Sequence, residues 1–263
     1  MNIGLVIIGD EILSGKRQDK HLPKCIELLA QRGLALSWAQ YVGDDRPRIT
    51  AALRAAFDSG DLVFSCGGIG ATPDDHTRQC AAAALGVDLV LHPEAKALIL
   101  ERMKDVAAEQ GLPFEPDRAD NQHRLNMGVF PLGARIIPNP YNKIAGFSVQ
   151  HVHFVPGFPV MAWPMMEWVL DQRYVHLHGG ARNIERSVIV FGAMEASLTP
   201  LMEDIEARFA GVKVFSLPSV DHPQWGRHIE LGVKAADDPL AAYAALRAAL
   251  EQFGAKLGPE LVR

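Results

Sequence analysis

The sequence predicts an α/β fold, with a parallel-type sheet covered by helices on both faces, followed by a small α+β domain. In the first hundred residues, apolar runs of strand length alternate with segments of helical periodicity. A stretch with two glycines and no clear period, Tyr174–Asn183, then precedes a second pattern of order β-α-β-β-α. We therefore expect two domains, at residues 1–171 and 172–263.

Each expected element has a local cause in the sequence. Gly33 stands where a helix commonly ends in a left-handed residue, and Asp45 can cap a helix that has Pro47 in its first turn. The strands expected in the first domain are Ile3–Ile8, Leu34–Val42, Leu62–Cys66, Ala145–Val149 and His151–Val155. The helices expected there are 19–32, 45–59, one capped by Asp74 or Asp75 that ends near Gly86, 93–110, 119–127 and one from Pro156–Pro159 to Asp171. The second domain is expected to hold strands at 187–191, 212–217 and 227–234 and helices at 195–209 and 239–253.

Composition narrows the class of protein. A net charge of −5 argues against nucleic acid as the main partner, because phosphate backbones are bound by clustered Lys and Arg. Three cysteines without a CxxC pair fit a reducing compartment. No apolar run approaches the ~20 residues of a membrane span, and the first residues lack the basic start of a signal peptide. We expect a cytoplasmic protein without a membrane partner.

The stretch from Asp61 to Thr77, DLVFSCGGIGATPDDHT, carries the strongest functional signal. Gly67, Gly68 and Gly70 follow an expected strand and precede an expected helix. Bare backbone at such a turn lets N–H groups approach phosphate oxygens, and the helix N-terminus adds positive partial charge. Thr72 and Thr77 could donate further hydrogen bonds. The alternative is a tight turn without a ligand.

Acidic pairs follow three of the expected strands, at Asp10–Glu11, Asp44–Asp45 and Asp74–Asp75. In a parallel sheet these turns share the edge at which ligands bind. Carboxylates beside a phosphate would repel it unless a divalent cation lies between them, and a carboxylate could also act as a base toward water. The alternative is that Asp45 and Asp75 only cap helices. Gly9–Arg17 does not match a P-loop, since five residues separate its glycines, and Gly68–Pro73 does not match the dinucleotide fingerprint.

Five segments together resemble a known family. GDEILSG (Gly9–Gly15), VGDD (Val42–Asp45) and GGIGATPDDHT (Gly67–Thr77) resemble the MoaB/Mog molybdopterin-binding superfamily, and NPYNKIAGF (Asn139–Phe147) and VPGFP (Val155–Pro159) are similar to later motifs of the competence/damage-inducible protein A (CinA) family. The resemblance covers roughly the first 170 residues. The last part is similar to the KH-like module of CinA proteins but lacks its GxxG loop, so we do not expect RNA binding. The chain looks like a stand-alone form without the CinA deamidase domain.

The resemblance implies a three-layer α/β fold and a phosphate-bearing small-molecule ligand, either a nucleotide or a pterin. It implies a metal-dependent pyrophosphatase acting on ADP-ribose or FAD, with Mg, Mn or Co and possibly K⁺, or a non-catalytic protein that binds molybdopterin. It also implies a homo-oligomer. The expected catalytic residues are Asp75 and Asp45, and the expected metal ligands are Asp10, Glu11 and Asp75. The expected ligand-binding residues are Gly9, Asp10, Glu11, Ser14, Gly67, Gly68, Gly70, Thr72, Asp74 and Thr77.

Some positions depart from the family pattern. Ala71 stands where the family often has Pro, and His21 stands where an Asn is common. Val160 and Met161 replace an acidic residue that usually follows the PG-x-P turn. These departures keep a third hypothesis open beside hydrolysis and pterin binding, namely a scaffold whose site has decayed.

Overall fold

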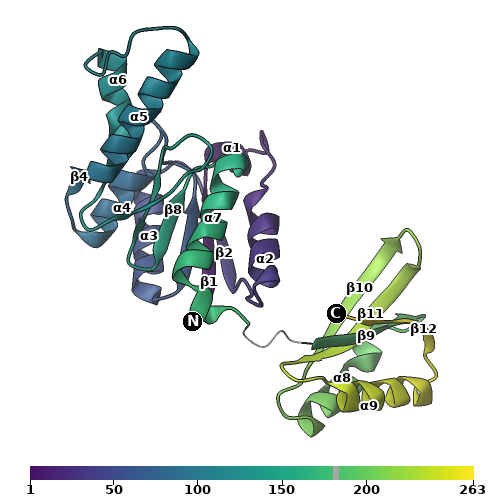
Figure 1. The fold of residues 1–263 in the computed structure, drawn as a ribbon. Helices are drawn as coiled ribbons and strands as arrows, with labels where there is room; N and C mark the ends of the chain where they lie inside the picture. Colours follow the sequence, from purple (N-terminus) through teal and green to yellow (C-terminus); the bar gives the residue numbers. More distant parts are fainter. Residues whose placement is uncertain (180–183) are drawn as a thin grey trace. The chain divides into compact units, whose positions relative to one another are not determined.

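The chain folds into two units, Met1–His178 and Gly179–Arg263 (Figure 1). The structure is a computed structural model that describes residues 1–179 and 184–263. The first unit continues past residue 171, because helix α7 (Pro159–Arg173) runs on and a short 3-10 helix, η2 (Val175–Leu177), follows it. Tyr174 and Leu177 pack against the core of this unit. The end of the expected Tyr174–Asn183 connection, residues 180–183, lies outside the described residues.

The first unit is built on a mixed, mostly parallel six-stranded sheet, as the sequence predicted. The strand order is β2-β1-β3-β8-β7-β6, in which β1, β2, β3 and β8 are parallel and β7 is antiparallel to both of its neighbours, β8 and β6. The strands are β1 (Ile3–Ile8), β2 (Trp38–Val42), β3 (Leu62–Cys66), β6 (Arg135–Ile137), β7 (Gly146–Val149) and β8 (Val152–Val155). β2 is shorter than the expected Leu34–Val42, because only its second half pairs with β1.

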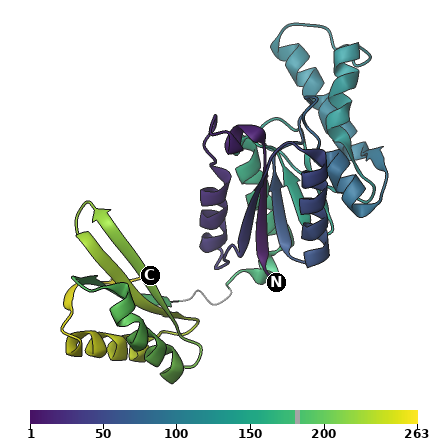
Figure 2. The ribbon, with the colours of Figure 1, turned by 180° about the vertical axis from the view of Figure 1, so that it is seen from behind.

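Helices cover both faces of this sheet, which confirms the expected three layers (Figures 1 and 2). One face packs against α2 (His21–Gln31) and α7, and the other against α3 (Arg46–Ser59) and α4 (Thr77–Leu85). Met165 and Met166 of α7 are fully buried, so this helix contributes apolar side chains to the core. Within the described residues, no helix is both long and apolar enough to cross a membrane.

A helical arm stands away from the sheet (Figures 1 and 2). It runs through β4 (Leu89–Leu91), α5 (Pro93–Glu109), α6 (Ala119–Arg124), η1 (Leu125–Gly128) and β5 (Val129–Pro131). β4 and β5 pair with each other, apart from the main sheet. The sequence did not indicate β4, β5 or β6, because three residues are too few to show a period.

The second unit is an antiparallel four-stranded sheet with two helices, which confirms the expected α+β class. The strand order is β10-β11-β9-β12, and α8 and α9 supply one core with the inward-facing residues of the sheet. The elements are β9 (Ile184–Phe191), α8 (Glu195–Arg208), β10 (Lys213–His222), β11 (Gly226–Ala235), α9 (Leu240–Gln252) and β12 (Lys256–Val262). β12 was not expected, because Gly258 and Pro259 interrupt its pattern, yet it pairs with β9.

Helix ends confirm some local predictions and correct one. Asp45 caps α3 by accepting a hydrogen bond from Arg48 N–H at 3.0 Å, and Gly33 takes a left-handed conformation just after α2, with φ 71°. The cap expected from Asp74 or Asp75 is wrong. His76 precedes α4 and makes no side-chain cap, while Asp75 turns back toward the glycine loop.

His153 is a fully buried imidazole that links β8 to β7 and to the end of α7. Its Nδ1 lies 2.7 Å from Ser148 Oγ and its Nε2 lies 2.8 Å from Tyr174 Oη. Burial, with smaller contributions from Arg173 and His151, lowers the pKa of His153 from 6.5 to about 3. The folded protein therefore keeps this ring neutral under conditions that protonate it in the unfolded chain.

We predict that His153 makes the fold sensitive to acid. Between pH 6.5 and about 3, the unfolded chain binds a proton at this residue that the folded chain does not. The free energy of unfolding should therefore fall as pH drops below 6.5, by up to about 1.4 kcal/mol per pH unit from this residue. Urea unfolding at a series of pH values should show a shallower slope for His153→Gln. His176→Gln, at an exposed histidine, should keep the wild-type slope.

Candidate functional site

The candidate site lies at the point where the order of the parallel strands reverses. The chain passes from β1 through α2 to β2 on one side, and then through α3 to β3 on the other side of β1. The turn after β1 adjoins the end of β2, since Gly9 N–H donates to Val42 O, and the turn after β3 adjoins the end of β8, since Gly67 N–H donates to Val155 O, each at 3.0 Å. A crevice at such a switch point is the usual ligand site of open α/β sheets.

The glycine loop after β3 requires its glycines for close packing. Gly67 has φ 104° and Gly68 has φ 67°, a region that residues with a Cβ rarely adopt. A Cβ on Gly67 would lie 2.2 Å from Ile8 O, and one on Gly70 would lie 2.6 Å from Asp75 Oδ2. The loop therefore crosses directly over the end of β1, with no room for side chains beneath it.

Two buried residues of α4 lock this loop from below. Thr77 is fully buried, and its Oγ1 donates to Gly67 O at 3.0 Å. The Arg78 guanidinium, also buried, donates to Ile69 O and, at 2.7 Å, to Gly70 O. Burial lowers the pKa of Arg78, and the charge of Asp75 opposes that shift. The sequence predicted that Thr77 binds the ligand and indicated no role for Arg78. In the structure, both side chains instead donate hydrogen bonds to carbonyl groups of the loop.

Because the carbonyl groups point to these anchors, several N–H groups of the loop are left without partners. Among the described residues, none accepts a hydrogen bond from the backbone N–H of Gly68, Ile69, Gly70 or Ala71. Thr72 differs, since its N–H and its Oγ1 both donate to Asp75 Oδ2, at 2.8 and 2.6 Å. A run of free N–H groups on bent backbone is the geometry that binds anions.

The first and second turns are tied together by their aspartates. Asp10 N–H donates to Asp44 Oδ2 at 2.9 Å, and Asp44 N–H donates to Asp10 Oδ1 at 3.1 Å. Burial raises the pKa of Asp44, and the negative charges of Asp10, Glu11 and Asp74 raise it further. The Asp44 carboxylate thus lies among other negative charges, and a bound cation would lower the free energy of its ionised form.

The structure brings most of the predicted site residues to one cavity of about 750 Å³, a size typical of small-molecule sites. Of the predicted residues, its walls include Gly9, Glu11, Gly67, Gly68, Gly70, Thr72, Asp74 and Asp75. Asp10 and Ser14 line a shallower hollow beside it. Asp45 and Thr77 line neither, because Asp45 caps α3 and Thr77 is beneath the loop.

The cavity also contains polar residues that the sequence analysis did not select. Lys16 and Arg17, in the turn after α1 (Asp10–Leu13), bring positive charge to the cavity, and Asp44 occupies the place expected for Asp45. The two cations stand directly after the GDEILSG motif, but the sequence analysis considered them only in rejecting a P-loop at Gly9–Arg17. Asn139 and Asn142 form the opposite wall.

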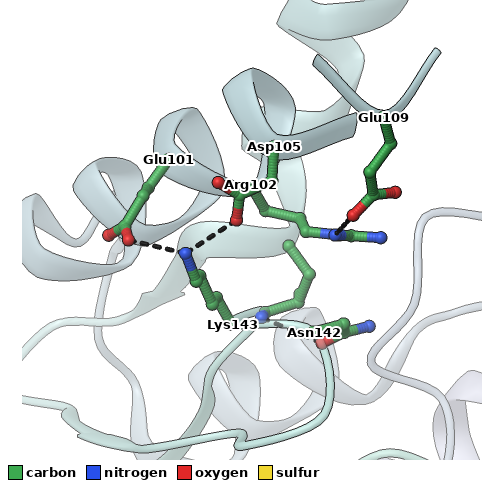
Figure 3. Close-up of polar contacts among 7 residues, drawn as sticks. Glu101, Arg102, Asp105, Glu109, Asn142 and Lys143 are labelled. Carbon is green, nitrogen blue, oxygen red and sulfur yellow. Dashed lines mark hydrogen bonds and ion pairs between the residues drawn. The ribbon is translucent and has the colours of Figure 1, made fainter. Parts of the chain in front are cut away.

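That opposite wall is a tightly bonded loop. Asn139 is buried, and its Nδ2 donates to Asn142 Oδ1 at 2.8 Å and to Ile144 O at 2.9 Å. Lys143 has φ 65°, a left-handed conformation that is costly for a residue with a Cβ. Its Nζ reaches across to α5, where it contacts Glu101 Oε1 at 2.6 Å and Asp105 Oδ2 at 2.7 Å (Figure 3). These two ion pairs of Lys143 therefore connect α5 of the arm to the cavity wall.

The donor set suits a cation that keeps water and phosphate among its ligands. No group of three or more His, Cys, Asp or Glu side chains in the described part of the chain is gathered closely enough to hold a metal alone. Asp44 and Glu11 offer carboxylate oxygens at the cavity, and Asp10 and Asp74 lie with them at the hollow beside it. Mg²⁺ is commonly bound by one or two carboxylates plus substrate phosphates and water, so the residues fit that group once a phosphate is present.

Comparison with known families gives this arrangement a context. Residues 4–176 match the family model described as a probable molybdopterin binding domain. The chain belongs to this family. The match covers the whole α/β unit up to η2, including the glycine loop and the acidic turns, and confirms the resemblance seen in the motifs.

Individual relatives are CinA-like proteins. The chain is 32% identical over 222 residues to one from Anaeromyxobacter dehalogenans, covering 81% of this chain and 51% of the relative. It is 31% identical over 220 residues to one from Syntrophotalea carbinolica, covering 80% and 51%. It thus spans about half the length of these curated relatives. A crystal structure of CinA from Thermoplasma acidophilum, a protein described as of unknown function, matches 65% of this chain and 98% of its own, with 28% identity and a TM-score of 0.54.

We predict that Lys143 keeps the Asn139–Ile144 wall in place. Its side chain is 38% exposed, so the ion pairs should add little to global stability. Lys143→Met should instead speed hydrogen exchange at the amides of Lys143 and Ile144, because the left-handed residue loses its external tie.

The matched control lies on the same helix. Arg102 pairs with Glu109 within α5 and does not reach the wall (Figure 3). Arg102→Met should leave exchange in the wall unchanged. Equal exchange rates in wild type and Lys143→Met would show that the internal hydrogen bonds of Asn139 are sufficient.

Proposed function

We propose that this member of the molybdopterin-binding and CinA-type family binds a nucleotide-like phosphate ligand and hydrolyses its pyrophosphate bond with the help of a divalent cation. The observation that carries the proposal is the set of free N–H groups from Gly68 to Ala71, facing a cavity bordered by acidic turns. These N–H groups bind the phosphate oxygens. Lys16 and Arg17 add positive charge on the neighbouring wall.

The acidic turns supply the second half of the proposal. Asp10 and Asp44, with Glu11 beside them, would hold a cation such as Mg²⁺, Mn²⁺ or Co²⁺ against the phosphate. When bound, the cation withdraws negative charge from the phosphoryl oxygens. Burial, and then repulsion by neighbouring carboxylates, raises the pKa of Asp44; a bound cation would favour the ionised form, so cation affinity should increase as pH rises and Asp44 ionises.

Asp75 is the residue that we assign to the attacking water. One of its oxygens, Oδ2, accepts both hydrogen bonds from Thr72, which fixes the carboxylate at the edge of the cavity. The other oxygen can orient a water and accept its proton as the water attacks phosphorus. The P–O bond to the leaving phosphate then breaks, which divides a dinucleotide such as ADP-ribose into AMP and a sugar phosphate.

A second candidate function is binding of a pterin phosphate without hydrolysis. It is favoured by the description of the family as a probable molybdopterin binding domain. Pterins and nucleotides share a phosphate and a flat ring, so the same loop and cavity serve either ligand. The two functions differ in whether product appears.

The direct test is AMP release from ADP-ribose and from FAD with Mg²⁺, Mn²⁺ or Co²⁺, with and without K⁺, separated by chromatography. We expect metal-dependent AMP from the wild-type protein. Asp75→Asn should reduce turnover by about 10²-fold or more while the ligand is still bound, because the amide cannot accept the proton. Asp44→Asn should weaken the metal dependence.

Asp45→Asn provides the matched control, at the next residue along the chain. Asn is as good a helix cap as Asp, and Asp45 does not line the cavity, so turnover should be unchanged. Loss of turnover in Asp45→Asn alone would instead support the catalytic role that the sequence predicted for Asp45. Absence of AMP with every metal, in a folded protein that binds the ligand, would favour the pterin-binding alternative.

A further inference from the structure

β2 forms an open edge of the six-stranded sheet (Figures 1 and 2). Among the described strands it pairs only with β1, and Ala39, Gln40 and Tyr41 are exposed along it. An open edge presents unpaired N–H and C=O groups that another extended chain can bind. Natural proteins therefore usually protect their edges with charged residues, proline or short strands.

The β2 edge lacks the protection that the other edges of the two larger sheets have. The stretch Gly33–Gly43, which contains β2, has no charged residue and no proline. At the other edge of the same sheet, β6 has only three residues and begins with Arg135. The edges of the second sheet, β10 and β12, each contain a proline and charged residues, namely Lys213, Pro218 and Asp221 in β10 and Lys256, Pro259 and Glu260 in β12. A further strand can thus join β2 without meeting a charge.

An apolar hollow of about 440 Å³ adjoins the start of this edge. Ile26 of α2, Leu34 and Leu36 of the segment before β2, and Ala39 of β2 line it. Ile26 is 48% exposed, although its side chain is large and apolar. The free strand edge and an uncovered apolar surface therefore lie next to each other.

The side chains of β2 alternate between the two faces of the sheet. Trp38 and Val42 pack with the core cluster on the α3 side, so Ala39 and Tyr41 face the α2 side. The hydrogen bond of Tyr41 agrees with this placement, because its Oη donates at 2.8 Å to Asp19, which lies just before α2. On the α2 side, the edge thus offers one small residue at the hollow and one large aromatic residue.

Two copies of β2 are complementary to each other. In the antiparallel register that pairs all five residues of the strand, Gln40 lies opposite the partner's Gln40, and Ala39 lies opposite the partner's Tyr41. Directly opposite side chains of an antiparallel pair are close enough to pack. A two-fold interface repeats each contact, so a large ring meets a small residue beside the hollow of both copies.

We propose that β2 pairs antiparallel with β2 of a second copy of this chain, so that the two sheets join across a two-fold axis and the partner's Tyr41 covers Ala39. Complementarity of charge and of side-chain size favours a second copy as the occupant. An unrelated strand would have to be equally free of charge and carry a large residue at the same position. The interface is independent of the function proposed for the glycine loop and the acidic turns.

The first test is the mass of the full chain in solution, measured by analytical ultracentrifugation over a concentration series. We expect a dimer for the wild type. Gln40→Lys and Gln40→Glu each place two like charges opposite each other, so either should weaken the dimer by about tenfold or more. Gln40 is exposed, so neither substitution changes the core of one copy. An equimolar mixture of the two variants should recover the dimer, because opposite charges then face each other.

The second test addresses the register by crosslinking. Gln40→Cys should give a disulfide-linked dimer under mild oxidation, because opposite residues of an antiparallel pair have Cα atoms about 4.5–5.5 Å apart, within the range of a disulfide. The native cysteines are buried and should not compete. Val220 provides the matched control, since it is 73% exposed on the protected edge strand β10. Val220→Cys should not crosslink, and Val220→Lys should leave the mass unchanged.

Three outcomes would overturn the proposal. A wild type that stays monomeric at every concentration would do so, even if the edge binds an uncharged peptide instead. A dimer that Gln40→Lys does not weaken would place the interface elsewhere. A mixture of Gln40→Lys and Gln40→Glu that stays monomeric would show that residue 40 does not face its own copy.

Discussion

The crossing of the glycine loop over the end of β1 is the constraint on which the site depends. Gly67 is so close to Ile8 O that a methyl group would not fit between them. That approach is secured from below by Thr77 and Arg78, which bind the loop carbonyls and leave the N–H groups of Gly68–Ala71 for a ligand. The buried Arg78 therefore has a structural role. It fixes the direction in which the loop peptide groups point, and it would affect ligand binding only through that direction.

Electrostatics sets the second constraint. The reciprocal hydrogen bonds of Asp10 and Asp44 bring the first two turns together, and the pKa of Asp44 is raised by burial and by its acidic neighbours. A phosphate bound at the glycine loop would add negative charge to this edge. The cation that we propose would lie between the two and stabilise both, which would account for acidic residues and the glycine loop lining one cavity. Lys16 lines the same hollow as these carboxylates and Arg17 pairs with Glu11 at 4.0 Å, so both cations offset part of this charge.

The sequence predicted the three layers, the parallel strands and the position of the loop, because these follow from local periodicity and from glycines next to a strand. It predicted that Asp45 caps α3, but it could not tell which of the two adjacent aspartates after β2 faces the cavity, and the folded chain places Asp44 there. It could not show that Thr77 is buried beneath the loop or that Arg78 anchors it. Short strands such as β4 and the irregular β12 gain their structure from pairing partners that lie far away in the sequence.

The claim that the acidic edge and the glycine loop form one cation–phosphate site is tested most directly by paramagnetic broadening with Mn²⁺, in NMR spectra of the protein with and without AMP. With AMP bound, Mn²⁺ should broaden the amide signals of Asp10, Asp44 and Asp75 together with the phosphorus signal of the nucleotide. Broadening confined to the second unit, for example at the clustered His222, Trp225 and His228, or broadening of the protein without the phosphorus signal, would contradict a shared cation–phosphate site.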